Sequence, residues 1–202
     1  MQTVSVDVAG PLVESDRGNK YLLCFVDHFT RYVDMFAIPN QTAETVAKIF
    51  VEEYITRYGI CENLLSDRGT NFLSDLIREV NRLLNINRKN TTPFHPATNS
   101  AVERVFRVVK TKLAHFCSRE TQKDWDQYVP FIRYVINQSW HASTNYSPAY
   151  LFYGRPLLTP LKLLLPKDAP ETVEGDYPEV MQARIRQVWE LARVYMTASR
   201  AA

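Results

Sequence analysis

Three carboxylate side chains, those of Asp7, Asp67 and Glu103, have types and positions that suit a divalent metal ion. Asp7 lies in an apolar strand-like stretch, Asp67 directly follows a second one, and Glu103 falls in the first turn of a long amphipathic helix. If two neighbouring strands and a helix packed across them bring the three together, they offer the converging oxygens that Mg²⁺ prefers. Such a site can hold two ions that assist both the attacking and the leaving oxygen in phosphoryl transfer.

Each carboxylate also has an ordinary structural interpretation. Asp7 could belong to a solvent-facing set with Ser5 and Ala9, because side chains of a strand alternate between its two faces. Asp67 could serve only as a turn former, and Glu103 could serve only the helix dipole. The three residues therefore have to be judged together.

Apolar periodicity indicates the elements that would position these residues. Three strands with short turn-forming spacers predict an antiparallel meander. After the meander we expect a helix that begins at Thr42 and ends at Gly59. The predicted strands are Thr3–Val8, Lys20–Asp27, Tyr32–Ile38, Asn63–Ser66 and Ile86–Thr91, and the later helices are Leu73–Leu84, Ser100–Phe116 and Trp125–Gln138. The predicted fold class is α/β, with a mixed five-stranded sheet flanked by helices.

The pattern becomes irregular after residue 140. We predict a core domain over residues 1–140, a post-core extension over 141–166, an acidic linker over 167–180 and a truncated C-terminal helix over 181–202. The linker prediction follows from five acids, no bases and two prolines between Asp168 and Glu179. The C-terminal helix has no evident partner in so short a tail. Three aromatic residues are predicted to lie in the core: Trp125, Phe131 and Trp140.

Composition excludes several classes of protein. The chain has 202 residues, of which 46% are hydrophobic, so it can bury a sizeable core. Its apolar runs are shorter than the roughly 20 residues that cross a bilayer, so we expect no membrane partner. Its three cysteines, Cys24, Cys61 and Cys117, are widely spaced, which argues against a disulfide framework or a zinc site and favours a reducing, intracellular environment. The net charge is +2, but Arg78–Lys112 holds eight basic and two acidic residues.

The motifs around the three carboxylates resemble those of retroviral and retrotransposon integrases. Thirty-five residues separate Asp67 from Glu103, as in the D,D(35)E signature of that family. A fourth motif resembles the stretch that follows the core in long-terminal-repeat elements of the gypsy type. The four similar stretches are Val6–Pro11, Ser66–Phe72, His95–Arg104 and Ser147–Pro156.

The resemblance implies a ribonuclease H-like fold and a polynucleotidyl transferase that uses Mg²⁺, for which Mn²⁺ can substitute. Its reactions would be endonucleolytic 3′-end processing of element DNA and strand transfer into target DNA. Asp7, Asp67 and Glu103 would carry over as catalytic metal ligands. The implied partners are DNA and further copies of the chain, in a homodimer or higher oligomer. The implied location is the nucleus or cytoplasm of a host cell.

Five further residues are candidates for DNA contact. Arg107 and Lys110 lie four and seven residues after Glu103, so one helix face would carry all three. Positive charge there could hold DNA phosphates, although ordinary exposed charge remains an alternative. His95 and Asn99 lie in the loop before the helix, and Asn71 could bond near Asp67 or merely shape the turn. His95 is more plausible as a structural or phosphate-facing residue than as a ligand, since magnesium rarely takes imidazole.

Two departures from the family pattern affect the expected activity. Asn99-Ser100 replaces the usual Asn-Gly, which removes a flexible residue before the last motif. The stretch also contains neither the zinc-binding domain that precedes the core in complete integrases nor a clear C-terminal DNA-binding module. We therefore expect competent chemistry with deficient substrate handling. A domesticated, catalytically weak DNA-binding protein and a ribonuclease H acting on RNA–DNA hybrids remain open as alternatives.

Overall fold

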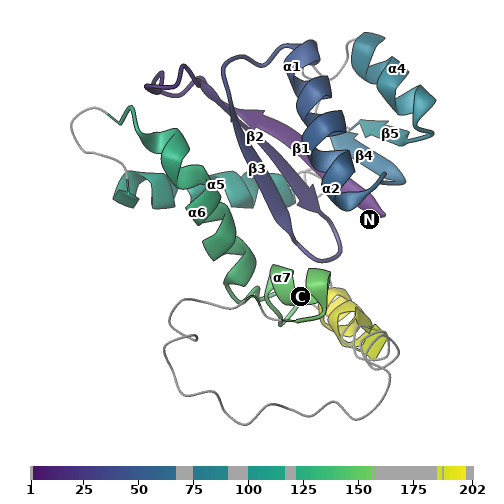
Figure 1. Cartoon of the computed structure of the whole chain (residues 1–202). Coiled ribbons are helices and arrows are strands. Elements are labelled where there is room, and N and C mark those ends of the chain that lie inside the picture. The colour runs from purple at the N-terminus through teal and green to yellow at the C-terminus, as the bar shows by residue number, and fades with distance from the viewer. Residues whose placement is uncertain are drawn as a thin grey trace. The chain divides into compact units, whose positions relative to one another are not determined.

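The computed structural model describes residues 2–66, 75–90, 100–116, 122–155, 157, 186–187 and 189–198, without the side chains of some of them. The chain divides into two compact units, Met1–Val135 and Ile136–Ala202, which are described separately below. The first unit contains one sheet whose strand order is β3-β2-β1-β4-β5 (Figure 1). The prediction of a mixed five-stranded sheet flanked by helices is confirmed.

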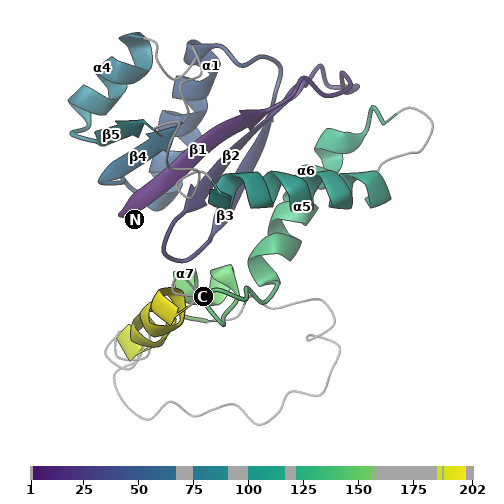
Figure 2. The ribbon, with the colours of Figure 1, turned by 180° about the vertical axis from the view of Figure 1, so that it is seen from behind.

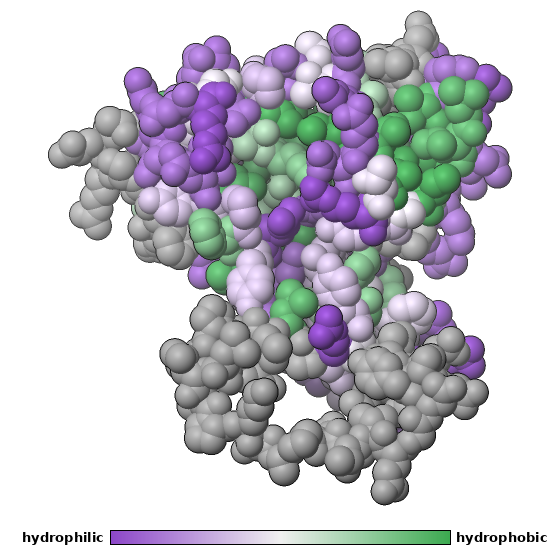
Figure 3. Space-filling view, in the orientation of Figure 1, coloured by the Kyte–Doolittle hydropathy of each residue, from purple (hydrophilic) through white to green (hydrophobic). Residues whose placement is uncertain are grey.

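Strands β1 (Thr3–Ala9), β2 (Tyr21–Asp27) and β3 (Val33–Ile38) form the predicted antiparallel meander. The turn between β1 and β2 is hydrophilic on its surface, where Glu14, Asp16 and Arg17 are exposed (Figure 3). Two hydrogen bonds attach this turn to the helix that begins at Trp125: Ser15 Oγ donates to Asp126 at 2.7 Å, and Trp125 Nε1–H donates to the Val13 carbonyl at 2.8 Å. The turn is thus held by side chains far away in the sequence.

One face of the sheet is covered by a helical segment that begins at the predicted cap. Thr42 caps α1 (Ala43–Lys48) by accepting a hydrogen bond from the Thr45 backbone N–H, and the segment continues through the π-helix η1 (Ile49–Ile55) and α2 (Thr56–Tyr58) to Gly59. Phe50 and Tyr54 project from η1 and both stack on Phe25 of β2. These rings belong to one apolar core with Val4 and Val6 of β1, as expected for alternate residues of a strand.

The opposite face of β1 and β2 is also covered. Helix α5 (Ser100–Phe116) packs against both strands on the side away from α1, as Figures 1 and 2 show from two directions. Ser5 and Cys24 point to this side and are fully buried. The alternative in which Ser5, Asp7 and Ala9 form a solvent-facing set is therefore wrong, because a helix covers that face.

Two short strands extend the sheet beyond β1. Strand β4 (Asn63–Ser66) pairs with β1 in parallel, and β5 (Asn87–Asn90) pairs with β4 in parallel. Helix α4 (Asp75–Leu83) joins them and packs against α1. Parallel neighbours need a crossover connection, which α4 supplies.

Helix α6 (Trp125–Gln138) buries only some of its apolar residues. Trp125, Val129 and Ile132 are buried, whereas Phe131 is 68% exposed. Trp140, just beyond the helix, is 65% exposed. The prediction that Phe131 and Trp140 are core residues is wrong, because apolar character indicates a preference for burial but not which helix face meets a neighbour.

The second unit contains α7 (Pro148–Tyr153) and a helix over residues 186–187 and 189–198. Trp189 donates its ring N–H to the carbonyl of Leu151 at 2.7 Å, and Ala192 is fully buried. The expectation that the C-terminal helix lacks a partner is therefore wrong, because the segment around α7 supplies one. Residues 167–180, predicted as a linker, lie outside the described residues. No helix in the described ranges is long and apolar enough to cross a membrane.

Candidate active site beside strands β1 and β4

Asp7 lies on β1 with its side chain on the face that α5 covers, and it is partly buried. Its Oδ1 accepts a hydrogen bond from the backbone N–H of Val8 at 2.8 Å. This contact ties the carboxylate to its own strand and limits its rotation. A carboxylate oriented in this way on a central strand is a suitable oxygen donor for a hard cation.

Cys24 stands directly opposite Asp7 on β2. Cross-strand partners share a face and lie about 4.5–5.5 Å apart at Cβ. Burial raises the pKa of the Cys24 thiol well above its usual value, and the negative charges of Asp7 and Asp34 raise it further. The neighbour of Asp7 is therefore a neutral thiol.

The end of β4 lies next to Asp7 on the other side. The parallel register places Ser66, the last residue of β4, opposite Val6 of β1, and Ser66 is buried. Asp67 follows Ser66 in the sequence and lies outside the described residues. Strands β1 and β4 thus bring the start of the second motif to the level of the first.

The backbone of Glu103 belongs to the first turn of α5, and its side chain lies outside the described residues. Its neighbour Val102 is fully buried, and Val109, two turns further on, is 1% exposed. These two valines identify the helix face that packs inward. Arg107 and Lys110 are exposed, as their predicted role requires.

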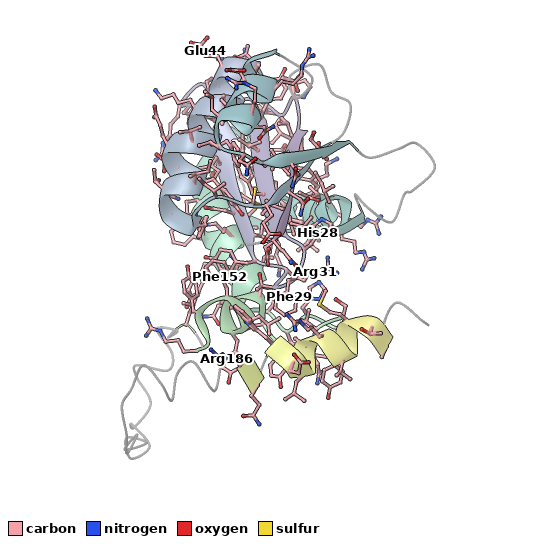
Figure 4. All side chains as sticks on the ribbon, turned by 90° about the vertical axis from the view of Figure 1, so that its right-hand side faces the viewer. His28, Phe29, Arg31, Glu44, Phe152 and Arg186 are labelled. Atoms are coloured by element: carbon pink, nitrogen blue, oxygen red, sulfur yellow. The ribbon has the colours of Figure 1, made fainter. Side chains whose placement is uncertain are left out.

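Three other predicted contact residues, Asn71, His95 and Asn99, lie outside the described residues. Sequence reasoning missed one part-buried contact on the face of Asp7. Ser5, two residues before Asp7, is hydrogen-bonded through Oγ to Nε2 of His28. His28 follows β2 in the turn that leads to β3, where Figure 4 also shows Phe29 and Arg31. Alternation along β1 could have indicated Ser5, but no local signal indicates His28.

A comparison with protein families decides the affiliation of the chain. Residues 1–96, which include Asp7, β4 and the position of Asp67, match the model of a family described as "Integrase core domain". The chain belongs to the integrase core domain family. The resemblance stated from the motifs is thereby confirmed.

Relatives of this integrase core domain are large polyproteins. The chain is 32% identical over 152 residues to the retrovirus-related Pol polyprotein from transposon 412 of Drosophila melanogaster, covering 75% of the chain and 12% of the relative. It is 34% identical over 139 residues to the Gag-Pol polyprotein of feline leukemia virus, covering 69% of the chain and 8% of the relative. The chain therefore spans only a small part of the proteins that it matches.

Solved structures share the fold of this integrase core domain. The catalytic core domain of BIV integrase has a TM-score of 0.59 at 22% identity, over 75% of the chain and 93% of that protein. A chain of the simian T-cell lymphotropic virus intasome in complex with PP2A regulatory subunit B56 gamma has a TM-score of 0.65 at 19% identity. The match covers 86% of this chain and 60% of that chain. The HTLV-2 integrase catalytic core domain in complex with magnesium, in a trimeric form, has a TM-score of 0.58 at 18% identity. The match covers 73% of this chain and 93% of that chain. The predicted ribonuclease H-like fold is confirmed.

Proposed function

We propose that this integrase core domain is the catalytic core of an enzyme that cuts and joins DNA strands. The reactions would be 3′-end processing of element DNA and strand transfer into target DNA. Asp7, Asp67 and Glu103 would be the catalytic carboxylates.

The register of β1 and β4 carries the proposal. Val6 of β1 pairs with Ser66 of β4, so these two residues lie at the same level of the sheet. Asp7 follows Val6, and Asp67 follows Ser66. Consecutive Cα atoms are 3.8 Å apart, so the step from Ser66 to Asp67 would bring the second carboxylate near Asp7. Residues separated by sixty positions in the sequence would then present two carboxylates at one place.

Helix α5 supports the third position. It packs against β1 and β2 on the face that carries Asp7, and Glu103 directly follows the fully buried Val102. Adjacent residues differ by about 100° around the helix axis, so Glu103 does not share the direction of Val102. Glu103 would supply the third carboxylate from this helix.

The set of donors fits a magnesium ion, for which manganese could substitute. Asp7, Asp67 and Glu103 would offer only carboxylate oxygens, which a hard cation prefers over nitrogen or sulfur. When bound, the ion would supply Lewis-acid activation of the phosphoryl oxygens. Without a cation, three neighbouring carboxylates would repel one another, and this repulsion would disfavour the state in which all three are ionised. The comparison with a relative described as being in complex with magnesium supports this assignment.

DNA contacts would extend from the carboxylates along α5. Arg107 and Lys110 share the helix side of Glu103 and are exposed, so both can reach phosphates. His95, Asn99 and Asn71 would add contacts near the reacting strand. Two copies or more would act together, in line with the relatives described as an intasome and as a trimeric form. The host nucleus or cytoplasm would be the place of action, where the buried, free Cys24 and Cys61 stay reduced.

An assay of DNA cleavage and joining on labelled branched and duplex oligonucleotides, with Mg²⁺ or Mn²⁺, tests the proposal. The wild-type chain should reverse strand transfer on a branched substrate, and Asp67→Asn and Glu103→Gln should abolish this activity. Asp16→Asn, at an exposed acid of the β1–β2 turn, is the matched control and should retain it. Wild-type activity no greater than that of Asp67→Asn would favour the domesticated DNA-binding alternative. Preferential cleavage of RNA–DNA hybrids would favour the ribonuclease H alternative.

A further inference from the structure

Trp140 is an exposed aromatic residue held in a fixed orientation. It is 65% exposed, and its ring N–H donates to Oδ1 of Asn145 at 3.2 Å. Asn145 has a φ of 60°, a conformation that asparagine tolerates better than most residues. The indole therefore shows a broad face to solvent while its single polar atom is occupied.

The loop over residues 139–147 is built to keep this arrangement. His141 and Tyr146 form an isolated antiparallel bridge, and the backbone N–H of Asn145 donates to the His141 carbonyl at 2.9 Å. Thr144 is fully buried, and its hydroxyl donates to the carbonyls of His141 and Tyr146 at 3.3 and 3.0 Å. Ser147 then caps α7 by accepting from the Tyr150 N–H. Such a closed hydrogen-bond pattern means that ordering Trp140 costs little entropy on binding.

The loop that carries Trp140 is polar, and residues 139–147 contain no Asp or Glu. Within residues 139–147, the other exposed positions are Ser139, Ala142 and Asn145. A protein interface has an apolar centre made by several neighbouring side chains, which this loop does not provide in the described chain. An exposed aromatic ring is the kind of platform on which unpaired nucleic-acid bases stack.

The sequence on either side of this loop is poor in acidic residues, which favours a polyanion as the ligand. Residues 127–167 contain no Asp or Glu, although the chain has 22 of them. An even distribution would place about four acids in a stretch of that length. The same stretch includes the basic residues Arg155, Lys162 and Lys167. Phosphates near Trp140 would therefore meet no repulsion from this stretch.

We propose that residues 139–147 form a stacking site for unpaired DNA bases, with Trp140 as the platform and Asn145 as the residue that orients it. The proposal rests on the proposed function only in taking DNA as the polymer. Stacking tolerates any base sequence, because every base has a π-face. The site would hold a strand segment at a place separate from the carboxylates.

Fluorescence anisotropy with a labelled oligothymidylate and with a labelled duplex of equal length tests this proposal on the full chain. Trp140→Ala should weaken binding of the single strand about tenfold, within the range measured for loss of one stacked base. Trp140→Phe should keep most of the affinity, and duplex binding should change less than twofold. Asn145→Ala should give an intermediate loss although the indole remains. Phe131→Ala removes an equally exposed aromatic ring outside the loop and should have no effect.

A second readout uses tryptophan emission. In the variant Trp125→Phe/Trp189→Phe, with folding checked by circular dichroism, Trp140 is the only indole, and oligothymidylate should quench it. If this variant does not fold, the difference in emission between wild type and Trp140→Phe gives the same information. Equal single-strand affinities of wild type and Trp140→Ala would overturn the stacking site but leave the proposed function intact. Failure of the wild type to bind either DNA would contradict both proposals. Altered sedimentation of Trp140→Ala with unchanged DNA affinity would point to a protein contact instead and refute the stacking site.

Discussion

Arg133 of α6 donates its guanidinium N–H to the carboxylate of Asp34 on β3, whose side chain is fully buried. Tyr58 OH donates to the same carboxylate at 2.9 Å, and Arg57 lies 3.6 Å from it. Asp34 thus connects the edge strand of the sheet to helices from two parts of the first unit. Its charge raises the pKa of Arg133, against the opposing effect of burial.

Arg133→Ala should lower the free energy of unfolding by about 2 kcal/mol, because it leaves a buried carboxylate with fewer partners. The expected loss is smaller than for complete isolation of a buried charge, since Tyr58 and Arg57 remain. Urea unfolding of the variant measures it. Arg193→Ala, in a helix-surface pair with Glu190, is the control and should cost about 0.5 kcal/mol or less. Equal losses in the two variants would show that Asp34 does not depend on Arg133.

Phe131→Ala should change stability by less than about 1 kcal/mol, whereas Ile132→Ala should cost about 3 kcal/mol. The two residues are adjacent on α6, but Phe131 is 68% exposed and Ile132 is fully buried. Thermal unfolding of the two variants distinguishes them directly. A larger loss for Phe131→Ala would mean that the helix presents its other face to the core.

Element positions could largely be predicted from the sequence, because caps and periodicity are local signals. Thr42 and Gly59 bound a helical segment as expected, and the strand boundaries of β1 to β4 lie within a residue or two of their predictions. Burial could not be predicted equally well. Phe131 and Trp140 are apolar but exposed, and Ser5 is polar but fully buried, because these outcomes depend on which distant helix covers a face.

In the candidate site, too, local features could be predicted from the sequence and long-range pairing could not. The spacing of Asp67 and Glu103 indicated a family, and the apolar neighbours of Asp7 indicated that it lies on a strand. The register that sets Ser66 opposite Val6 could not be read from the sequence, because parallel pairing depends on the crossover between strands. The contact between Ser5 and His28, twenty-three residues apart, likewise depends on the turn after β2.

Stability should decline as the pH rises from 9 to 11, and Cys61 should account for part of the decline. Burial raises the pKa of the Cys61 thiol from 9.0 to about 11. The unfolded chain therefore loses this proton first, which favours unfolding. The contribution is fully present below pH 9 and is lost as the pH approaches 11. Urea unfolding at pH 8.5, 9.5 and 10.5 should show a shallower decline for Cys61→Ala than for wild type. Parallel declines would contradict the assignment.

Arg107→Ala/Lys110→Ala should weaken duplex binding and flatten its salt dependence. Loss of two phosphate contacts should reduce the slope of log K against log salt concentration by about 2. Lys48→Ala/Arg104→Ala removes the same charge from exposed positions and should change the slope by less than half as much. Anisotropy titrations between 50 and 300 mM salt give the slopes. Identical slopes for the two double variants would show that Arg107 and Lys110 are ordinary surface charges and not specific phosphate contacts.

Anomalous diffraction from a crystal containing Mn²⁺ tests the central claim, that Asp7, Asp67 and Glu103 form one metal site. Manganese stands in for magnesium because it accepts the same oxygen ligands and scatters anomalously. The account predicts an anomalous peak beside the end of β1, with carboxylate oxygens of all three residues about 2.0–2.2 Å from an ion. It also predicts loss of that peak in Asp67→Asn. A manganese peak at another position, or three carboxylates that stay apart at saturating manganese, would contradict the proposal of one shared metal site.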